Sequence, residues 1–514
     1  MMPSHDTILI LDFGSQYTQL IARALRSLSV YCEIHPFNLA PEKIRQIAPK
    51  AVILSGSPFS LLDPDPPRPD ELVWNLGLPL LGICYGQQLI ADRFGGAIER
   101  HTNREYGRAL LEPALPHPLL DGIPAGAEVW MSHGDSVSRL PEGFQALAST
   151  ATVPFAAIGH LSQPIYALQF HPEVVHTPQG KALLANFALR IAGCVPDWTP
   201  ENFIASSLDQ IRATVGAAKV VLGLSGGVDS SVAALLLHRA LGDRLIPIFV
   251  DNGCMRFREA ERVREAFSAV PGLNIRCVDA SDLFLERLAG IDDPEQKRRS
   301  IGHTFIEVFE REAARYDGVT FLAQGTLYPD VIESVSFRGP SATIKSHHNV
   351  GGLPDKMGLK LIEPFRELFK DEVRAVGREL GLPEALISRH PFPGPGLAVR
   401  IIGAVDAARV SCLQAIDEIF ISELRAWGLY DSTWQAFAVL LPIRSVGVMG
   451  DERTYENVCA LRAVNSVDGM TADWTELPPA FLKHVSSRVI NEVRGVNRVV
   501  YDISSKPPAT IEWE

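Results

Sequence analysis

The chain has 514 residues, of which 46% are hydrophobic and 21% charged, so it is long enough for about two to four globular domains. Its net charge of −12 argues against a broad nucleic-acid surface, although a small basic pocket for a nucleotide stays open. The seven scattered cysteines disfavour a disulfide framework or a zinc knuckle, and they suit a reducing, cytoplasmic setting. We expect no signal peptide and no membrane helix, because no apolar stretch approaches about 20 residues.

The first third of the chain alternates short apolar strands with helices. Strands are predicted at residues 8–11, 51–54 and 80–83, and a helix at residues 19–28. Such alternation predicts a parallel sheet that is covered by helices. Two prolines within residues 194–200 interrupt the series, so the first predicted domain spans residues 1–195.

A nucleophile motif follows the third of these strands. Gly82-Ile83-Cys84-Tyr85-Gly86 places a cysteine between two glycines at a strand-to-helix junction, which is the pattern of a nucleophile elbow. The helix start favours the reactive thiolate, and the backbone N–H of Tyr85 can point at a developing oxyanion. A buried structural cysteine is the plain alternative.

A candidate acid–base pair lies further along the chain, where His171 and Glu173 are separated by one proline. His171 can take the proton of the thiol and later protonate a leaving amine, while Glu173 can orient the imidazole. A lone His-Pro-Glu is more often a turn than a catalytic pair, but together with the elbow it predicts a triad with Cys84.

A second series of strands and helices begins at Lys219 and contains a glycine-rich loop between a strand and a helix. The loop comprises Ser225, Gly226, Gly227, Val228, Asp229, Ser230 and Ser231. Glycine N–H groups and the helix start form a cradle for an anion. The loop lacks the lysine of the common phosphate loop and carries Asp229 where a metal that bridges phosphates needs a carboxylate. It therefore predicts pyrophosphate as a leaving group and AMP transfer, with an ordinary turn as the alternative.

The proline-rich stretch at residues 390–396 reads as a linker, so the second and third predicted domains span residues 200–390 and 391–514. The third contains a predicted helix at residues 410–426 and strands at 436–441 and 498–503. The predicted fold class is α/β, with two doubly wound, mostly parallel-sheet domains followed by a smaller α+β domain.

These motifs carry a resemblance to known proteins. The first unit resembles class I glutamine amidotransferase domains, and the whole chain resembles the family of glutamine-hydrolysing GMP synthases. The likeness covers all three units, and its segments are residues 12–17, 82–86, 131–135, 169–173, 225–231, 251–253, 344–352 and 506–514. The 344–352 segment and the Lys-Pro-Pro tail are more specific to the family than the elbow.

The resemblance implies an enzyme with two sites. Glutamine would be hydrolysed in the first unit through a thioester on Cys84. ATP with Mg²⁺ would adenylate xanthosine 5′-monophosphate in the second unit, and ammonia would then displace AMP to give GMP. The implied partners are these small molecules rather than nucleic acid or membrane, and the implied assembly is a cytoplasmic homodimer that forms through the third domain.

The resemblance also assigns roles to individual residues. Gly56 matches the second oxyanion donor beside Tyr85, although Ser57 stands where the family usually has another glycine. At the ATP site, Val250 and Gly325 join the 225–231 loop, and Asp229 would lie near Mg²⁺. The implied lid residues are Lys345, His347 and His348. The implied contacts of the xanthine nucleotide are Arg298, Asp451, Lys506 and Glu512.

Two other interpretations stay open at this point. One is a different glutamine-dependent enzyme that splits ATP to AMP, such as an NAD- or asparagine-type synthetase, which the Lys-Pro-Pro tail disfavours. The other is a non-catalytic nucleotide-binding regulator, which the presence of Cys84, His171 and Asp229 disfavours.

Overall fold

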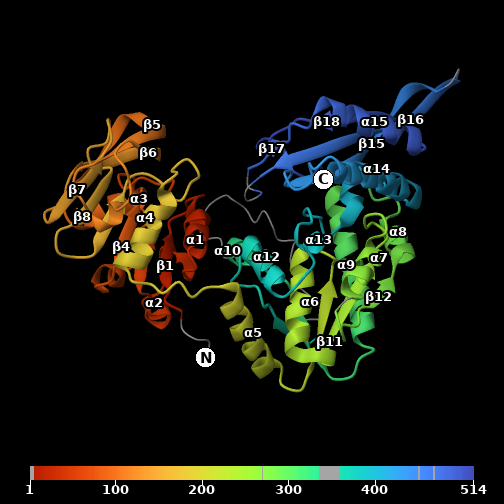
Figure 1. Ribbon diagram of the computed structural model, residues 1–514, viewed down its shortest axis with the longest axis horizontal. Coiled ribbons are helices and arrows are strands. Elements are labelled where there is room, and N and C mark those ends of the chain that lie inside the picture. The colour runs from red at the N-terminus through yellow and green to blue at the C-terminus, as the bar shows by residue number, and fades with distance from the viewer. Residues whose placement is uncertain (1–4, 269, 335–357, 450–451, 467–468, 470) are drawn as a thin grey trace. The chain divides into compact units, whose positions relative to one another are not determined.

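The computed structural model describes residues 5–268, 270–334, 358–449, 452–466, 469 and 471–514. Among these residues, one compact unit runs to Ser206 and the other from Ser207 to Glu514 (Figure 1). No helix of the described ranges is long and apolar enough to cross a membrane. The cysteines all lie in those ranges, and none of them forms a disulfide there.

The first unit is built on a nine-stranded sheet in the order β2-β1-β3-β4-β9-β8-β7-β5-β6. Its parallel strands are β1 (Ile8–Asp12), β2 (Cys32–Pro36), β3 (Ala51–Leu54), β4 (Leu80–Ile83) and β9 (Ile165–Leu168). Its antiparallel strands are β5 (Ala97–Pro113), β6 (Ala127–Arg139), β7 (Phe144–Ser149) and β8 (Ala157–His160). Of these, β1, β3 and β4 are apolar runs that are buried along almost their whole length, as helix-covered strands are.

Helical segments cover this sheet and lead to the second unit. They are α1 (Thr18–Arg26), α2 (Pro41–Ile47), η1 (Glu71–Asn75), α3 (Tyr85–Arg93), η2 (Pro118–Leu120), α4 (Gly180–Ala185), η3 (Asn186–Ile191) and α5 (Pro200–Val215). The predicted strands at residues 8–11, 51–54 and 80–83 and the predicted helix at 19–28 are confirmed within one or two residues.

The second unit contains a parallel sheet in the order β12-β11-β10-β13-β14. Its strands are β10 (Lys219–Leu224), β11 (Leu245–Asp251), β12 (Arg276–Asp279), β13 (Val319–Ala323) and β14 (Lys360–Ile362). The chain moves outward from β10 to β12 and then returns to the other side of β10 at β13. In such sheets the crevice at the carboxyl ends of the two strands where the order reverses is the usual ligand site.

The helices around this sheet are α6 (Val228–Leu241), η4 (Gly242–Arg244), α7 (Glu259–Ser268), α8 (Ser281–Leu288), α9 (Pro294–Ala313), α10 (Tyr328–Ser334), α12 (Lys370–Glu379) and α13 (Glu384–Ile387). The C-terminal part adds η5 (Gly396–Arg400), α14 (Ala407–Ala426), β15 (Gln435–Met449), β16 (Glu452–Asn465), β17 (Asp473–Trp474), α15 (Pro479–Glu492) and β18 (Val496–Asp502). The C-terminal strands form a separate sheet. In it, β15 and β17 pair antiparallel to β16, and β18 pairs parallel to β16. The α/β fold class with a smaller α+β region is confirmed.

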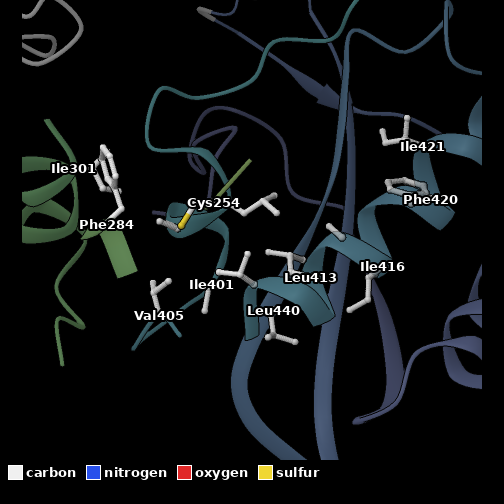
Figure 2. Close-up of a cluster of buried hydrophobic side chains, with 14 of the residues drawn as sticks. Cys254, Phe284, Ile301, Ile401, Val405, Leu413, Ile416, Phe420, Ile421 and Leu440 are labelled. Carbon is white, nitrogen blue, oxygen red and sulfur yellow. The ribbon is translucent and has the colours of Figure 1, made fainter. Parts of the chain in front are cut away.

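One hydrophobic cluster runs through the second unit and crosses the predicted boundary at residues 390 and 391. Figure 2 shows Cys254 and Phe284 in the same cluster as Leu413 and Phe420 of α14. Residues 391–514 therefore share an apolar core with the residues before them, and their separation as a domain of their own stays a prediction.

Candidate active sites

The elbow at Cys84 is shaped by two glycines at which any side chain would clash with neighbouring backbone. Cys84 lies between β4 and α3 with φ at +54°. A Cβ on Gly82 would lie 2.4 Å from the carbonyl of Gly86, and a Cβ on Gly86 would lie 2.3 Å from the carbonyl oxygen of Leu54 in β3. The glycines thus permit the sharp turn that raises the thiol at the end of the strand.

The predicted acid–base pair meets beside this thiol. The imidazole Nδ1 of His171 lies 2.6 Å from Glu173 Oε1, and both side chains are buried. Burial alone would lower the pKa of His171, but the Glu173 carboxylate and the interaction with Cys84 outweigh it and raise this pKa well above its ordinary value. The arrangement suits an imidazole that takes and holds the proton of the Cys84 thiol.

Gly56 follows β3 and faces the same imidazole. A Cβ at this position would lie 3.3 Å from His171 Cε1 and 3.4 Å from Ser15 Oγ, so a side chain here would press on the triad. The phenol of Tyr85 points away and donates to the carbonyl of Pro67 at 2.8 Å, which leaves only the backbone of Tyr85 for an oxyanion role. The structure therefore brings Gly56, Tyr85 and the three triad residues together.

Two residues that the sequence did not indicate support the His-Pro-Glu turn. Thr177 Oγ1 donates to the carbonyl of His171 at 2.7 Å and accepts from the backbone N–H of Trp130 in β6 at 3.1 Å. A Cβ on Gly180, the first residue of α4, would lie 1.7 Å from the carbonyl oxygen of Pro172. Both contacts depend on the path of the turn, which no local pattern reveals.

In the 225–231 loop, residues 225–227 connect β10 to α6 and residues 228–231 form the first turn of α6, at the carboxyl edge where the strand order reverses. Gly226 has φ at +76°. Ser230 Oγ lies 3.0 Å from Ser225 Oγ and accepts from the N–H of Ser225 at 3.2 Å, so these hydroxyls hold the loop in its curve. The loop and the first turn of α6 form a site suited to an anion.

Cationic side chains surround this loop, although the sequence did not identify them. Arg389 donates to the carbonyl of Gly226 at 2.8 Å and pairs with Glu259. Lys370 Nζ lies 3.7 Å from Asp229 Oδ2. Positive charge beside the cradle favours the pyrophosphate of a nucleotide.

Asp229 has the features of a metal ligand. Within the described residues its Oδ1 atom is buried and has no hydrogen-bond partner. Burial raises the pKa of this carboxyl, while Lys370 and Arg374 oppose the rise. An open carboxylate oxygen beside a phosphate cradle fits Mg²⁺, which binds through one or two carboxylates together with substrate phosphates.

The other two predicted ATP residues border the same edge. A Cβ on Gly325, just after β13, would lie 3.5 Å from Asp229 Cβ. Val250 is buried near the end of β11, the strand on the opposite side of β10. The structure thus groups the loop, Asp229 and Gly325, with Val250 one strand away.

The C-terminal tail contacts one predicted substrate residue, Arg298, and itself contains two others, Lys506 and Glu512. Arg298 in α9 donates to the main-chain oxygen of Glu514. Glu512 forms a two-point pair with Arg400, at 3.0 and 2.8 Å, and accepts from Gln435 at 2.8 Å. Lys506 Nζ donates to the carbonyl of Gly469 at 2.7 Å, so its contacts do not join those of Arg298 or Glu512.

Fully buried cations anchor this tail, which the sequence did not predict. Arg462 in β16 donates to the carbonyls of Ile511 at 2.8 Å and Thr510 at 2.9 Å, and Lys297 Nζ lies 2.5 Å from Glu514 Oε2. A cavity of about 660 Å³ adjoins the tail and is lined by Asp292, Pro294, Ile402, Gly403, Leu441, Pro442, Ile443, Trp513 and Glu514. The predicted lid residues Lys345, His347 and His348, and the predicted contact Asp451, lie outside the described residues.

Comparisons with known proteins match all three parts of the chain. Sequence-family models match residues 9–191 as "Glutamine amidotransferase class-I", residues 201–276 as "NAD synthase" and residues 422–513 as "GMP synthase C terminal domain". The chain is similar to three proteins named "GMP synthase [glutamine-hydrolyzing]", each 58% identical. They come from Pelodictyon phaeoclathratiforme (99% of this chain and 100% of the relative), Sinorhizobium fredii (99% and 99%) and Chlorobaculum tepidum (100% and 100%).

Proposed function

The chain belongs to the family of glutamine-hydrolysing GMP synthases, and we propose that it divides this reaction between the two sites described above. These enzymes are ligases that form a carbon–nitrogen bond in guanine nucleotide synthesis. They aminate xanthosine 5′-monophosphate to GMP with ATP and with nitrogen from glutamine. The observation that carries the division is the buried pair of His171 and Glu173 beside the Cys84 elbow, in a unit separate from the 225–231 loop.

In the proposed glutaminase reaction, Cys84 Sγ attacks the amide carbon of glutamine. His171 accepts the proton of the thiol and gives it to the departing nitrogen, so ammonia leaves and a thioester remains. The N–H groups of Gly56 and Tyr85 stabilise the oxyanion of each tetrahedral intermediate. Glu173 holds the imidazole in place, and water then cleaves the thioester to glutamate.

In the proposed synthetase reaction, the C2 oxygen of xanthosine 5′-monophosphate attacks the α-phosphorus of ATP. Pyrophosphate leaves into the cradle of residues 225–231, beside Lys370 and Arg389. Ammonia then adds at C2 and AMP departs. Asp229 would hold Mg²⁺, which when bound neutralises charge on the leaving pyrophosphate.

The remaining roles follow the same proposal. Val250 and Gly325 would border the adenosine of ATP. Lys345, His347 and His348 would act as a lid over it. The xanthine nucleotide would contact Arg298, Asp451, Lys506 and Glu512. The two-point pairing of Glu512 with the buried Arg400 supports a tail that is held firmly enough to present such contacts.

A nucleophile test separates the two halves of the reaction. Cys84→Ala should abolish glutamine hydrolysis and glutamine-dependent GMP formation, because no thiol remains to form the thioester. GMP formation from ammonium salts, ATP and xanthosine 5′-monophosphate should persist. Cys194→Ala, which removes another buried thiol of the same unit, is the matched control and should keep both activities. Glutamine hydrolysis by Cys84→Ala would overturn the assignment.

We also propose that the third predicted domain, residues 391–514, forms a cytoplasmic homodimer. The support is a set of exposed apolar side chains on β15 and β16, namely Ile443, Val446, Val448 and Tyr455. Light scattering should give twice the mass of one chain for the parent protein and one chain mass for Val448→Glu. Val175→Glu, at a still more exposed valine of the first unit, should leave the mass unchanged. A dimeric Val448→Glu would refute the assigned surface.

A further inference from the structure

Asp135 is a buried carboxylate that the proposed chemistry does not use. It closes the 131–135 motif in β6 and is only 7% exposed. Its Oδ2 atom accepts a hydrogen bond from the hydroxyl of Ser60, and its Oδ1 atom lies 3.6 Å from Arg100 Nε. A buried acid with two polar partners from different segments is a tether between those segments.

Ser60 is the centre of the loop at residues 57–63, which continues directly from the oxyanion residue Gly56. Ser60 Oγ accepts from the N–H of Leu62 at 3.1 Å, and the N–H of Ser60 donates to Asp63 at 3.3 Å. Asp63 in turn pairs with Arg100 at 2.8 Å. Ser60, Asp63, Arg100 and Asp135 therefore form a closed polar ring that holds the loop against β6.

The main chain of Asp135 is fixed to the nucleophile helix. Gln88 in the first turn of α3 donates from Nε2 to the carbonyl of Asp135 at 2.8 Å and is itself buried. Three residues earlier in β6, the carbonyl of Ser132 lies 3.7 Å from Cys84 Sγ. One short segment of β6 thus touches the thiol, the helix that follows it and the loop that follows Gly56.

We propose that Asp135 is a positioning residue for glutamine hydrolysis, acting through Ser60 and Arg100 to keep the loop, and with it the Gly56 N–H, at the correct distance from Cys84. This inference rests on the proposed roles of Cys84 and Gly56. An oxyanion donor is effective only when it lies about 2.7–3.1 Å from the developing charge. A small shift of the loop therefore reduces the stabilisation of the transition state more than it reduces the binding of the substrate.

The test compares variants of the tether in the full chain. Ser60→Ala and Asp135→Asn should lower kcat for glutamine hydrolysis by about 10- to 100-fold, with a smaller change in KM. Ser60→Thr, which keeps the hydroxyl, should restore most of kcat. Asp121→Asn, which breaks a surface pair with Arg190 in the same unit, is the matched control and should behave as the parent.

Two further readouts separate positioning from general damage. Alkylation of Cys84 by iodoacetamide needs the thiol and His171 but no oxyanion donor, so its rate should stay close to that of the parent in both tether variants. Thermal unfolding of Ser60→Ala should stay cooperative, with a midpoint only a few degrees below that of the parent, because one hydrogen bond to a buried carboxylate is lost. The proposal fails if kcat is unchanged in both variants, or if alkylation slows as much as hydrolysis. If only this inference is wrong, Cys84→Ala is still inactive with glutamine. If Cys84→Ala hydrolyses glutamine, the proposed glutaminase site itself is wrong.

Discussion

At the scale of single residues, spacing predicted the elbow, while contacts across the fold determined its surroundings. Gly82 and Gly86 could be chosen from the pattern because both serve a turn of five residues. The sequence singled out Asp135 but gave no role, since its partner Ser60 lies 75 residues earlier in the chain. A local pattern can indicate where the backbone requires a glycine, whereas a tether between distant segments exists only after the sheet has formed. The roles of the triad residues stay predictions.

Gly180 offers a test at this scale. Gly180→Ala would place a methyl group 1.7 Å from the carbonyl oxygen of Pro172, so the turn that carries His171 and Glu173 must shift. We expect kcat for glutamine hydrolysis to fall about 10- to 100-fold, because a displacement of about 1 Å misaligns the proton transfer. GMP formation from ammonia should be unchanged. Gly302→Ala, where an added Cβ would meet no atom of the described residues within 4 Å, is the control. Hydrolysis at the parent rate would show that the turn absorbs the methyl group.

At the scale of helices and strands, short buried runs were predicted well and long exposed ones were not. The strand predicted at residues 436–441 is confirmed, but β15 continues to Met449. Its outer part includes exposed residues such as Val448, whose extended form comes from pairing with β16 rather than from burial. The strand order and the antiparallel β5 and β6 were likewise not predicted, because pairing between distant segments leaves no local signal.

A substitution at Gly226 tests whether the 225–231 loop acts as the phosphate cradle. Gly226→Ala adds a Cβ at a φ of +76°, only 3.0 Å from Val263 and 3.1 Å from Glu259, so the backbone is strained and either the loop or these side chains must shift. We expect the KM for ATP to rise about tenfold or more, since a strain of about 1–2 kcal/mol is placed on the binding conformation. Gly216→Ala imposes a similar positive φ where no atom lies near, and it separates local strain from damage to the site. Equal KM values in the two variants would contradict the assigned cradle.

At the scale of the whole molecule, the described residues cluster into two compact units, and the division of residues 200–514 into two domains stays a prediction. The prolines after His390 predicted a linker, since they exclude a helix interior. In the structure this segment lies against the core. Leu397 donates to the carbonyl of Cys254 at 2.7 Å, and the ring of His390 stacks on Tyr430 at 3.8 Å. Composition identifies the break in regular structure but says nothing of the surface on which the broken segment packs.

His390 makes the second unit sensitive to acid. Burial lowers its pKa from 6.5 to about 4. Below pH 6.5 the unfolded chain binds a proton that the folded chain refuses, so stability is lost as the pH falls towards 4. The loss approaches about 3 kcal/mol over that range. Denaturant unfolding of the parent and of His390→Gln should be measured between pH 7 and pH 4.5. The free energy of unfolding of the parent should exceed that of the variant by less at pH 4.5 than at pH 7. A constant difference at every pH would mean that His390 titrates normally.

The contact between Lys297 and Glu514 joins positions 217 residues apart, so it can form only after the end of the chain has been synthesised. The first unit is complete while about 300 residues are still to be translated, which takes about 15–60 s at ordinary rates of synthesis. Throughout that interval a growing chain on the ribosome already carries its thiol elbow, yet it lacks the C-terminal tail that Lys297 and Arg462 hold in place. Under the proposed roles of the two sites, an unfinished chain would therefore release ammonia before its own synthetase site is able to use it.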